Sequence, residues 1–219
     1  MDLRALLSEM LGTLLLVCVV VGSGVMAQNL SGGNDALALL GNTLATGAIL
    51  YVLITILAPV SSAHFNPAVS VVFFLRGELK LSGLILFIFM QLIGGVLGTM
   101  LAHVMFELPL LTPSVNIRQG SGQFIAETVA TFGLVLTILG GVRWRPDAIP
   151  ALVGLYITAG YWFTASTSFA NPAVTLARGF TDSFSGIRPI DMPVFWAAQF
   201  FGVVLAWLLA RFLFPKSSN

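Results

Sequence analysis

Asn66-Pro67-Ala68 and Asn171-Pro172-Ala173 are two copies of one triplet, and each opens a short apolar stretch. Proline at the first position of a helix is preorganised and loses no needed hydrogen bond, while asparagine immediately before it is a good N-cap. Each triplet therefore predicts the start of a helix. The helices predicted at 67–75 and 172–178 are about half as long as a membrane span. Such pieces are tolerated at membrane depth only beside protein or a water-filled cavity, so the pair indicates one central pore.

The composition of the chain is that of a membrane protein. Of its 219 residues, 57% are hydrophobic and only 9% are charged, and the mean hydropathy is +0.96. A soluble domain of this length would need more charge to cover its surface. The formal net charge of +1 shows no basic footprint, so we expect no nucleic-acid partner. The single cysteine, Cys18, cannot form an internal disulfide, and we interpret it as a packing residue.

Six apolar runs are long enough to cross a hydrocarbon core of about 30 Å. They lie at 3–26, 36–58, 81–106, 121–142, 149–166 and 192–214. We interpret the first run as a retained helix and not as a signal peptide, because Glu9 lies inside it. The chain is therefore predicted to be an all-α integral membrane protein embedded in the lipid bilayer.

The basic residues are unevenly divided between the two sides of this scheme. One side has Arg4, Arg76, Lys80, Arg143, Arg145, Arg211 and Lys216, and the other has Arg118, Arg178 and Arg188. The positive-inside rule then places both termini in the cytoplasm, which agrees with an even number of spans.

The two halves of the chain resemble each other. Residues 8–13 align with 126–131 through Glu9 and Glu127, and the region around Gln91 aligns with the region around Gln199. Three spans per half is an odd number, so the second half must be inverted relative to the first. Inverted repeats place their site near the membrane midplane, where broken helices meet. We predict one domain, 1–219, with repeats at about 1–106 and 121–214.

The order Glu, Asn-Pro-Ala, Gln, found twice, resembles the major intrinsic protein family, the aquaporins and aquaglyceroporins. The resemblance covers nearly the whole chain. It implies six transmembrane helices, two re-entrant half-helices, an inverted 3+3 repeat and a homotetramer. It also implies that Asn66 and Asn171 are the hydrogen-bond donors of the pore. With the side-chain oxygen used as a helix cap, the amide NH₂ is predicted to be free to face the solute. Two half-helix N-termini at the midplane would repel cations.

Other polar residues receive structural interpretations. An intramembrane carboxylate is a functional candidate by default, so a proton relay is one reading of Glu9 and Glu127. The resemblance favours the other reading, in which each is a buried acceptor for N–H groups of the loop near its own half-helix. His64 is either a gate or, as we expect, a contributor of its backbone carbonyl to the pore. His103 is expected at the membrane interface.

The resemblance implies a second constriction formed by Thr46, Ala159, Ser168 and Val174. Most family members have arginine directly after the second triplet, where this chain has Val174. Arg178 follows one helical turn later, and we expect it at the outer mouth in a surface ion pair with Asp182. Water-selective members also bring an aromatic residue and a histidine to this constriction, which Thr46 and Ala159 do not supply.

A filter without the usual arginine is predicted to be wide and uncharged. Pore diameter and the polarity of the lining set the selectivity of such channels. We therefore expect polyols, urea-like molecules and neutral trivalent metalloid hydroxides such as arsenous acid and its antimony counterpart to pass, with some water. Valine at this position also resembles a bacterial subgroup of aquaglyceroporins that is associated with arsenic resistance.

These observations predict a passive channel in a bacterial inner (plasma) membrane, without a cofactor or a metal. A plain water or glycerol facilitator is the alternative within the fold. A secondary transporter with alternating access is the alternative from another class, since inverted repeats occur there too. The chain is not expected to be an enzyme, because no His, Asp and Cys residues have the spacing of a ligand set or of a catalytic constellation.

Overall fold

The computed structural model describes residues 2–215, and the regular elements of that part are all helices. Lys216, counted above among the basic residues, lies outside it. The elements are α1 (Leu3–Leu30), α2 (Asp35–Ser61), α3 (Pro67–Leu75), α4 (Leu81–Met105), α5 (Ser121–Trp144), η1 (Pro146–Ala148), α6 (Ile149–Phe163), α7 (Pro172–Arg178), η2 (Pro189–Asp191) and α8 (Met192–Leu213).

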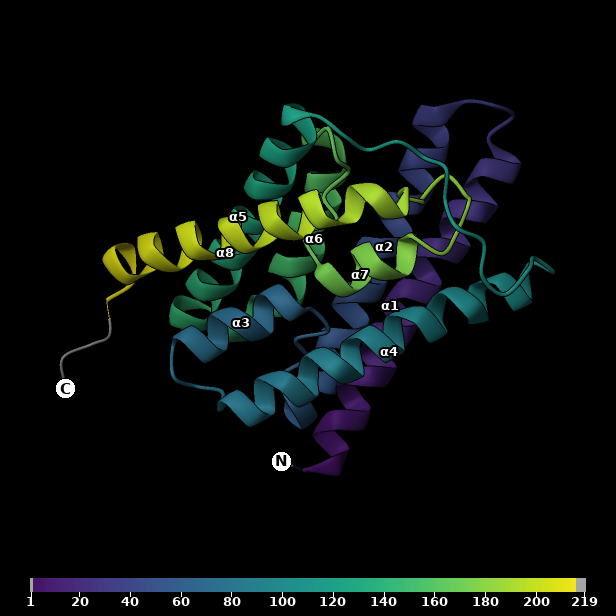
Figure 1. Cartoon of the computed structure of the whole chain (residues 1–219). Helices are drawn as coiled ribbons and strands as arrows, with labels where there is room; N and C mark the ends of the chain where they lie inside the picture. The colour runs from purple at the N-terminus through teal and green to yellow at the C-terminus, as the bar shows by residue number, and fades with distance from the viewer. Residues whose placement is uncertain (1, 216–219) are drawn as a thin grey trace.

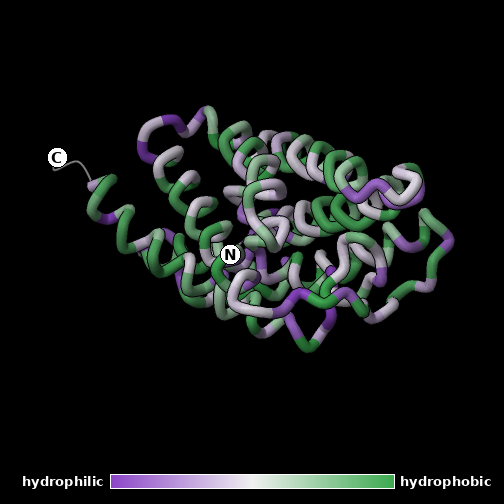
Figure 2. The backbone as a smooth tube through the Cα atoms, turned by 90° about the horizontal axis from the view of Figure 1, so that it is seen from above, coloured by the Kyte–Doolittle hydropathy of each residue, from purple (hydrophilic) through white to green (hydrophobic). Residues whose placement is uncertain are grey.

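Five segments of the described chain are helical, long and apolar enough to cross a membrane: α1, α2, α4, α5 and Pro189–Leu213, which contains α8. The remaining predicted span, 149–166, forms α6, which has 15 residues and ends at Phe163. At 1.5 Å per residue α6 is about 22 Å long, and the turn η1 extends it at its start. Hydrophobic residues dominate the helices, and hydrophilic stretches lie in connecting segments (Figure 2).

The contacts between elements repeat in the two halves of the chain. α1 packs on α2 and α4, and α5 packs in the same way on α6 and α8. The half-helices α3 and α7 lie in the middle of the molecule, between α4 and α8 (Figure 1). Each also reaches into the other half, since α3 contacts α8 and α7 contacts α4. This arrangement is the one expected of two inverted halves in which the half-helix of each half packs against a long helix of the other.

Glycines let the long helices of each half come close together. A Cβ atom on Gly98 of α4 would lie 2.3 Å from the carbonyl oxygen of Leu14 in α1. A Cβ atom on Gly202 of α8 would lie 2.6 Å from the carbonyl oxygen of Thr128 in α5. Both obstacles are backbone atoms, so only glycine fits there without a shift of the helices.

Candidate pore

Both half-helices begin at the residues predicted from the triplets. Asn66 caps α3 by accepting the Ala68 N–H at 2.9 Å, and Asn171 caps α7 by accepting the Ala173 N–H at 2.9 Å. Pro67 and Pro172 occupy the first helical position. Fixed φ and a missing N–H cost nothing at that position, which explains why the sequence specifies these starts so sharply.

The two asparagines also bind each other's loops. Asn66 Nδ2 donates to the carbonyl oxygen of Ala170 at 2.8 Å, and Asn171 Nδ2 donates to that of Phe65 at 2.9 Å. The expectation of a wholly free amide NH₂ is therefore wrong, because each group spends one hydrogen on this cross-link. An amide nitrogen carries two hydrogens, so one donor per asparagine remains for a solute.

The backbone before each triplet has the same unusual conformation. Left-handed φ values of 69°, 51° and 48° occur at Ser62, Ala63 and Phe65, and values of 63°, 52° and 47° occur at Thr167, Ser168 and Ala170. Residues other than glycine rarely adopt a left-handed φ, and such a backbone conformation persists only where the surrounding structure holds it. The two loops thus carry matching strain at matching positions.

Buried carboxylates hold both loops. Glu9 accepts the His64 N–H at 2.9 Å, the Phe65 N–H at 2.7 Å, the Ser61 hydroxyl and the Gln91 amide. Such a carboxylate satisfies loop donors that helices and water do not reach.

Glu127 makes the corresponding bonds in the second half. It accepts the Phe169 N–H at 2.8 Å and the Ala170 N–H at 2.9 Å, and Gln199 donates to it at 2.6 Å. Because every bond is to a loop or to a helix of the same half, the geometry is that of a structural acceptor.

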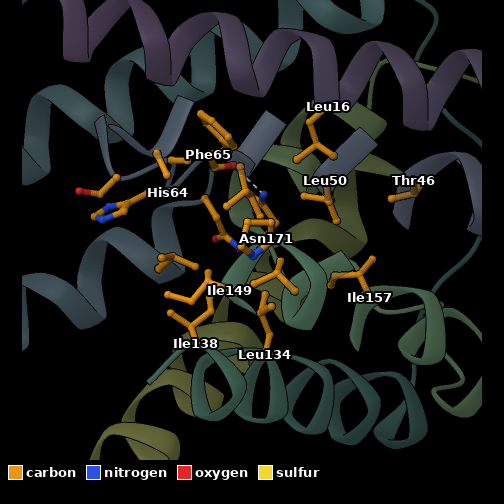
Figure 3. Close-up of a pocket in the computed structure, with 18 of the residues that line it drawn as sticks. Leu16, Thr46, Leu50, His64, Phe65, Leu134, Ile138, Ile149, Ile157 and Asn171 are labelled. Atoms are coloured by element: carbon orange, nitrogen blue, oxygen red, sulfur yellow. Dashed lines mark hydrogen bonds between the residues drawn. The ribbon is translucent and has the colours of Figure 1, made fainter. Parts of the chain in front are cut away.

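A cavity of about 510 Å³ runs past both triplets. The lining includes residues at both ends of α6. We call the end at Pro146, Asp147 and Ile149 the inner end, and the end at Tyr161, with Thr46 and Arg178, the outer end. Apolar residues of α1, α2, α5 and α6 cover much of the wall, among them Leu16, Leu50, Leu134, Ile138 and Ile157. Figure 3 shows Asn171 near the middle, with His64 and Thr46 on opposite sides of it.

The outer end contains three of the four predicted filter residues. Thr46, Ser168 and Val174 line the cavity. Ala159 does not: its side chain is exposed, and Tyr161 lines the cavity in its place. Tyr161 shares a hydrogen bond of 3.2 Å with Thr46. Counting back from Asn171 fails by two residues, and two residues turn a helix by about 200°, to the opposite face.

Arg178 is not at the surface. Its side chain is 1% exposed and lines the cavity, and its Nε donates to the carbonyl oxygen of Ser185. Its guanidinium carbon lies 3.4 Å from the centroid of the Phe169 ring. The expected ion pair with Asp182 is absent from the ion pairs of residues 2–215, and Asp182 instead accepts the N–H of Val115.

A second arginine, Arg118, lies against the same aromatic ring as Arg178. The guanidinium carbon of Arg118 is 5.0 Å from the Phe169 centroid. Arg118 donates to the carbonyl oxygens of Gly186 at 2.8 Å and Ser166 at 3.1 Å. Burial lowers the pKa of the Arg118 guanidinium, and the negative charge of Glu127 partly opposes that shift. Arginine starts from so high a pKa that Arg118 remains a cation at neutral pH.

The two histidines are both buried. The His64 ring lines the cavity, lies 3.0 Å from the Ser70 hydroxyl and stacks on Phe73 at 4.7 Å. His103 is held inside the protein, because its nitrogens lie 2.6 Å from the Pro109 carbonyl oxygen and 2.8 Å from the Thr181 hydroxyl. It thereby ties α4 to the segments that contain Pro109 and Thr181, and its position at the membrane interface stays a prediction. Within the described residues there is no group of three or more His, Cys, Asp and Glu side chains that could hold a metal ion.

Sequence reasoning missed Tyr161, Phe169 and Arg118, and it misplaced Arg178. Usable signals existed for Phe169, which the internal repeat pairs with His64, and for Arg178. Arg178 lies four residues after Val174, and residues four apart share a helix face, so a pore-lining Val174 implies a pore-facing Arg178.

Comparisons with known proteins agree with this geometry. Residues 1–165 match the family described as Major intrinsic protein. The chain is 58% identical over 210 residues to Aquaglyceroporin AqpS of Rhizobium meliloti (strain 1021), covering 96% of this chain and 90% of that protein. It is 30% identical over 235 residues to a probable TIP-type aquaporin of Medicago truncatula, covering 99% and 89%. The X-ray structure of the aquaglyceroporin from Plasmodium falciparum matches with a TM-score of 0.75 at 24% identity, covering 94% of each chain. The last match confirms the predicted fold class.

Proposed function

Because this chain belongs to the major intrinsic protein family and is a membrane channel, not an enzyme, we propose that it conducts small neutral solutes passively. The preferred solutes are trivalent metalloid hydroxides, arsenite and antimonite in their neutral forms, and glycerol-like polyols, with some water. No cofactor takes part.

The pair of cross-linked caps is the observation that carries this proposal. Asn66 and Asn171 meet inside one cavity, and each has one amide hydrogen left to offer. The N-termini of α3 and α7 add partial positive charge at the same level. A hydroxyl oxygen can accept hydrogen bonds there, whereas a cation loses its water and meets only donors and positive dipoles.

The outer end supports the choice of solutes. Thr46, Tyr161 and Ser168 supply hydroxyl groups, and Val174 presents a small apolar wall where most family members have arginine. Hydroxyl groups both donate and accept, so they suit a solute that carries several hydroxyls. The high identity to a protein named as an aquaglyceroporin agrees with passage of polyols.

The location and assembly follow from the same reasoning. The chain is an integral membrane protein with a bacterial relative. We place it in an inner (plasma) membrane with both termini in the cytoplasm, following the positive-inside rule. We also assign it a homotetramer, as the family resemblance implies. The carbonyl of His64 is assigned to the pore, and Glu9 and Glu127 are assigned to support of the loops.

An alternating-access transporter is less well supported. Coupled transporters usually have an ion-binding carboxylate at the midplane, but Glu9 and Glu127 are both buried and bound by loop N–H groups and a glutamine. A plain water or glycerol facilitator differs from the proposal only in its solutes, so flux measurements separate the two.

Reconstitution into liposomes tests the proposal. Stopped-flow light scattering should show permeation by water, glycerol, urea and arsenite without any ion gradient, with little saturation. Empty liposomes are the control. Uptake that requires a proton or sodium gradient contradicts the channel, and permeation by water alone contradicts the solute class.

A further inference from the structure

Arg178 is a buried cation that forms no ion pair within residues 2–215. Its Nε binds the Ser185 carbonyl oxygen, while its Nη1 is buried and has no hydrogen-bond acceptor among residues 2–215. Burying a charge is costly unless other groups compensate. The ring of Phe169 compensates in part through a cation–π interaction at 3.4 Å. A buried charge that is only partly compensated is costly to the stability of the protein, so it is a candidate for a functional role.

The guanidinium lies on the solute path. Arg178, Tyr161 and Val174 line one cavity. Val174 and Arg178 are one helical turn apart on the same face of α7. A solute that passes the small Val174 side chain therefore meets a fixed positive charge at the next turn.

The internal repeat shows why a planar group fits there. Counting from the two asparagines, His64 corresponds to Phe169 and Phe73 corresponds to Arg178. His64 stacks on Phe73 at 4.7 Å, and Arg178 stacks on Phe169 at 3.4 Å. The fold thus builds the same stacked pair at both ends of the cavity. Only the second half places a charge in it.

We propose that Arg178 is the specificity-determining cation of the outer end, supplying from one turn beyond Val174 the fixed charge that this position lacks. This inference rests on the proposed function and deepens it. The guanidinium lines the cavity and repels cations from it. The constriction is therefore wide at Val174 but charged, in contrast to the uncharged filter expected from the sequence.

Urea and guanidinium are the matched probes. They have nearly the same planar shape and size, and they differ in charge. The measured quantity is the ratio of urea to guanidinium permeability in liposomes containing equal amounts of inserted protein. Wild type should pass urea and largely exclude guanidinium.

Arg178→Met removes the charge and keeps the length of the side chain, so the ratio should fall about tenfold or more because a repulsive charge is lost from a poorly solvated site. Arg178→Lys keeps the charge and should keep the ratio within about threefold of wild type. Arg4→Met is the matched control, because Arg4 is exposed at the start of α1 and does not line the cavity. It should leave the ratio unchanged.

Each outcome decides. A lowered ratio in Arg178→Met, restored in Arg178→Lys, supports the inference. An unchanged ratio in Arg178→Met overturns it, even if both fluxes fall, because a purely structural residue would act on both. An equal fall in the Lys and Met variants overturns it too.

Two further measurements apply if the variants do not insert into liposomes or if the wild-type protein does not conduct neutral solutes. If Arg178→Met does not insert, Arg178→Gln, which is also neutral and planar at its end, takes its place, and the same fall or constancy of the ratio decides. A wild type that passes guanidinium nearly as fast as urea overturns the inference. A wild type that passes neither urea nor glycerol refutes the proposed function itself.

Discussion

The two ends of the pore have one architecture and different chemistry. At the inner end His64 stacks on Phe73 and meets Phe87 edge-on at 5.4 Å. At the outer end Phe169 lies beneath Arg178 and meets Phe195 edge-on at 5.1 Å. The repeat therefore fixes where planar groups lie, and substitution within that frame makes a guanidinium one of the two stacked groups at the outer end.

The shared part of the two loops concerns the backbone. In both halves a left-handed segment, a carboxylate and a glutamine surround the cap. Gln91 also donates to Ser70, and Gln199 donates to Thr175, which occupy corresponding positions of α3 and α7. These bonds support the half-helices and are the same at both ends. The comparison shows that the two loops share one backbone conformation and one set of supporting hydrogen bonds. We infer that the side chains that differ between them set the selectivity.

Removal of the carboxylate charge should produce the largest effect. In Glu9→Gln and Glu127→Gln one acceptor oxygen becomes an NH₂ group that faces N–H donors. A buried donor left without an acceptor costs about 1–3 kcal/mol, and the repulsion between donors adds to this. Both variants should lose much of their thermal stability in detergent, by a similar amount.

Exposed Glu107→Gln is the control and should leave the melting temperature unchanged. If Glu9→Gln and Glu127→Gln differ widely in stability, the loops are not equivalent devices. If both are as stable as wild type, the role of acceptor is wrong.

Reversal of the donors at the caps should have the next largest effect. Asn66→Asp and Asn171→Asp keep a helix cap, because aspartate also caps helices. They replace the remaining donor with a negative charge, break the cross-link and remove the midplane barrier to cations. Glycerol flux should fall about tenfold or more in each, consistent with loss of oriented donors at the narrow midplane, or the protein should fail to fold.

Asn29→Asp, at the exposed end of α1, serves as the control for the asparagine variants. Parallel glycerol and sodium permeabilities check the prediction. Folded Asp variants that conduct glycerol normally and still exclude sodium would show that the caps do not select the solute.

Local signals made much of this molecule predictable from its sequence. The bounds of α3 and α7 follow to the residue from Asn-Pro and from the end of the apolar stretch. The spans follow from hydropathy, although α1 continues to Leu30 and α2 to Ser61, a few residues past the predicted bounds.

Features that depend on long-range packing were not predictable in this way. The register of Tyr161 depends on how residues 164–171 fold back, and spacing alone does not give that path. The burial of Arg178 depends on Phe169 and on the carbonyl oxygen of Ser185, which lies in the segment after α7. A charged side chain is normally exposed, so the sequence favoured a surface position.

Substitution of Val174 by arginine tests the central claim, that neutral solutes pass a wide outer end beside Val174. A second guanidinium would narrow the passage next to Arg178 and add donors that suit water better than a larger hydroxylated solute. The account predicts that Val174→Arg sharply cuts arsenite and glycerol flux while water flux falls less. Val174→Leu, which adds bulk without charge, should have a smaller effect on all three. The measurement is the parallel permeability of water, glycerol and arsenite on the same reconstituted protein, normalised to the amount inserted. An equal fractional loss of all three fluxes, or no loss, would show that Val174 does not line the selective constriction.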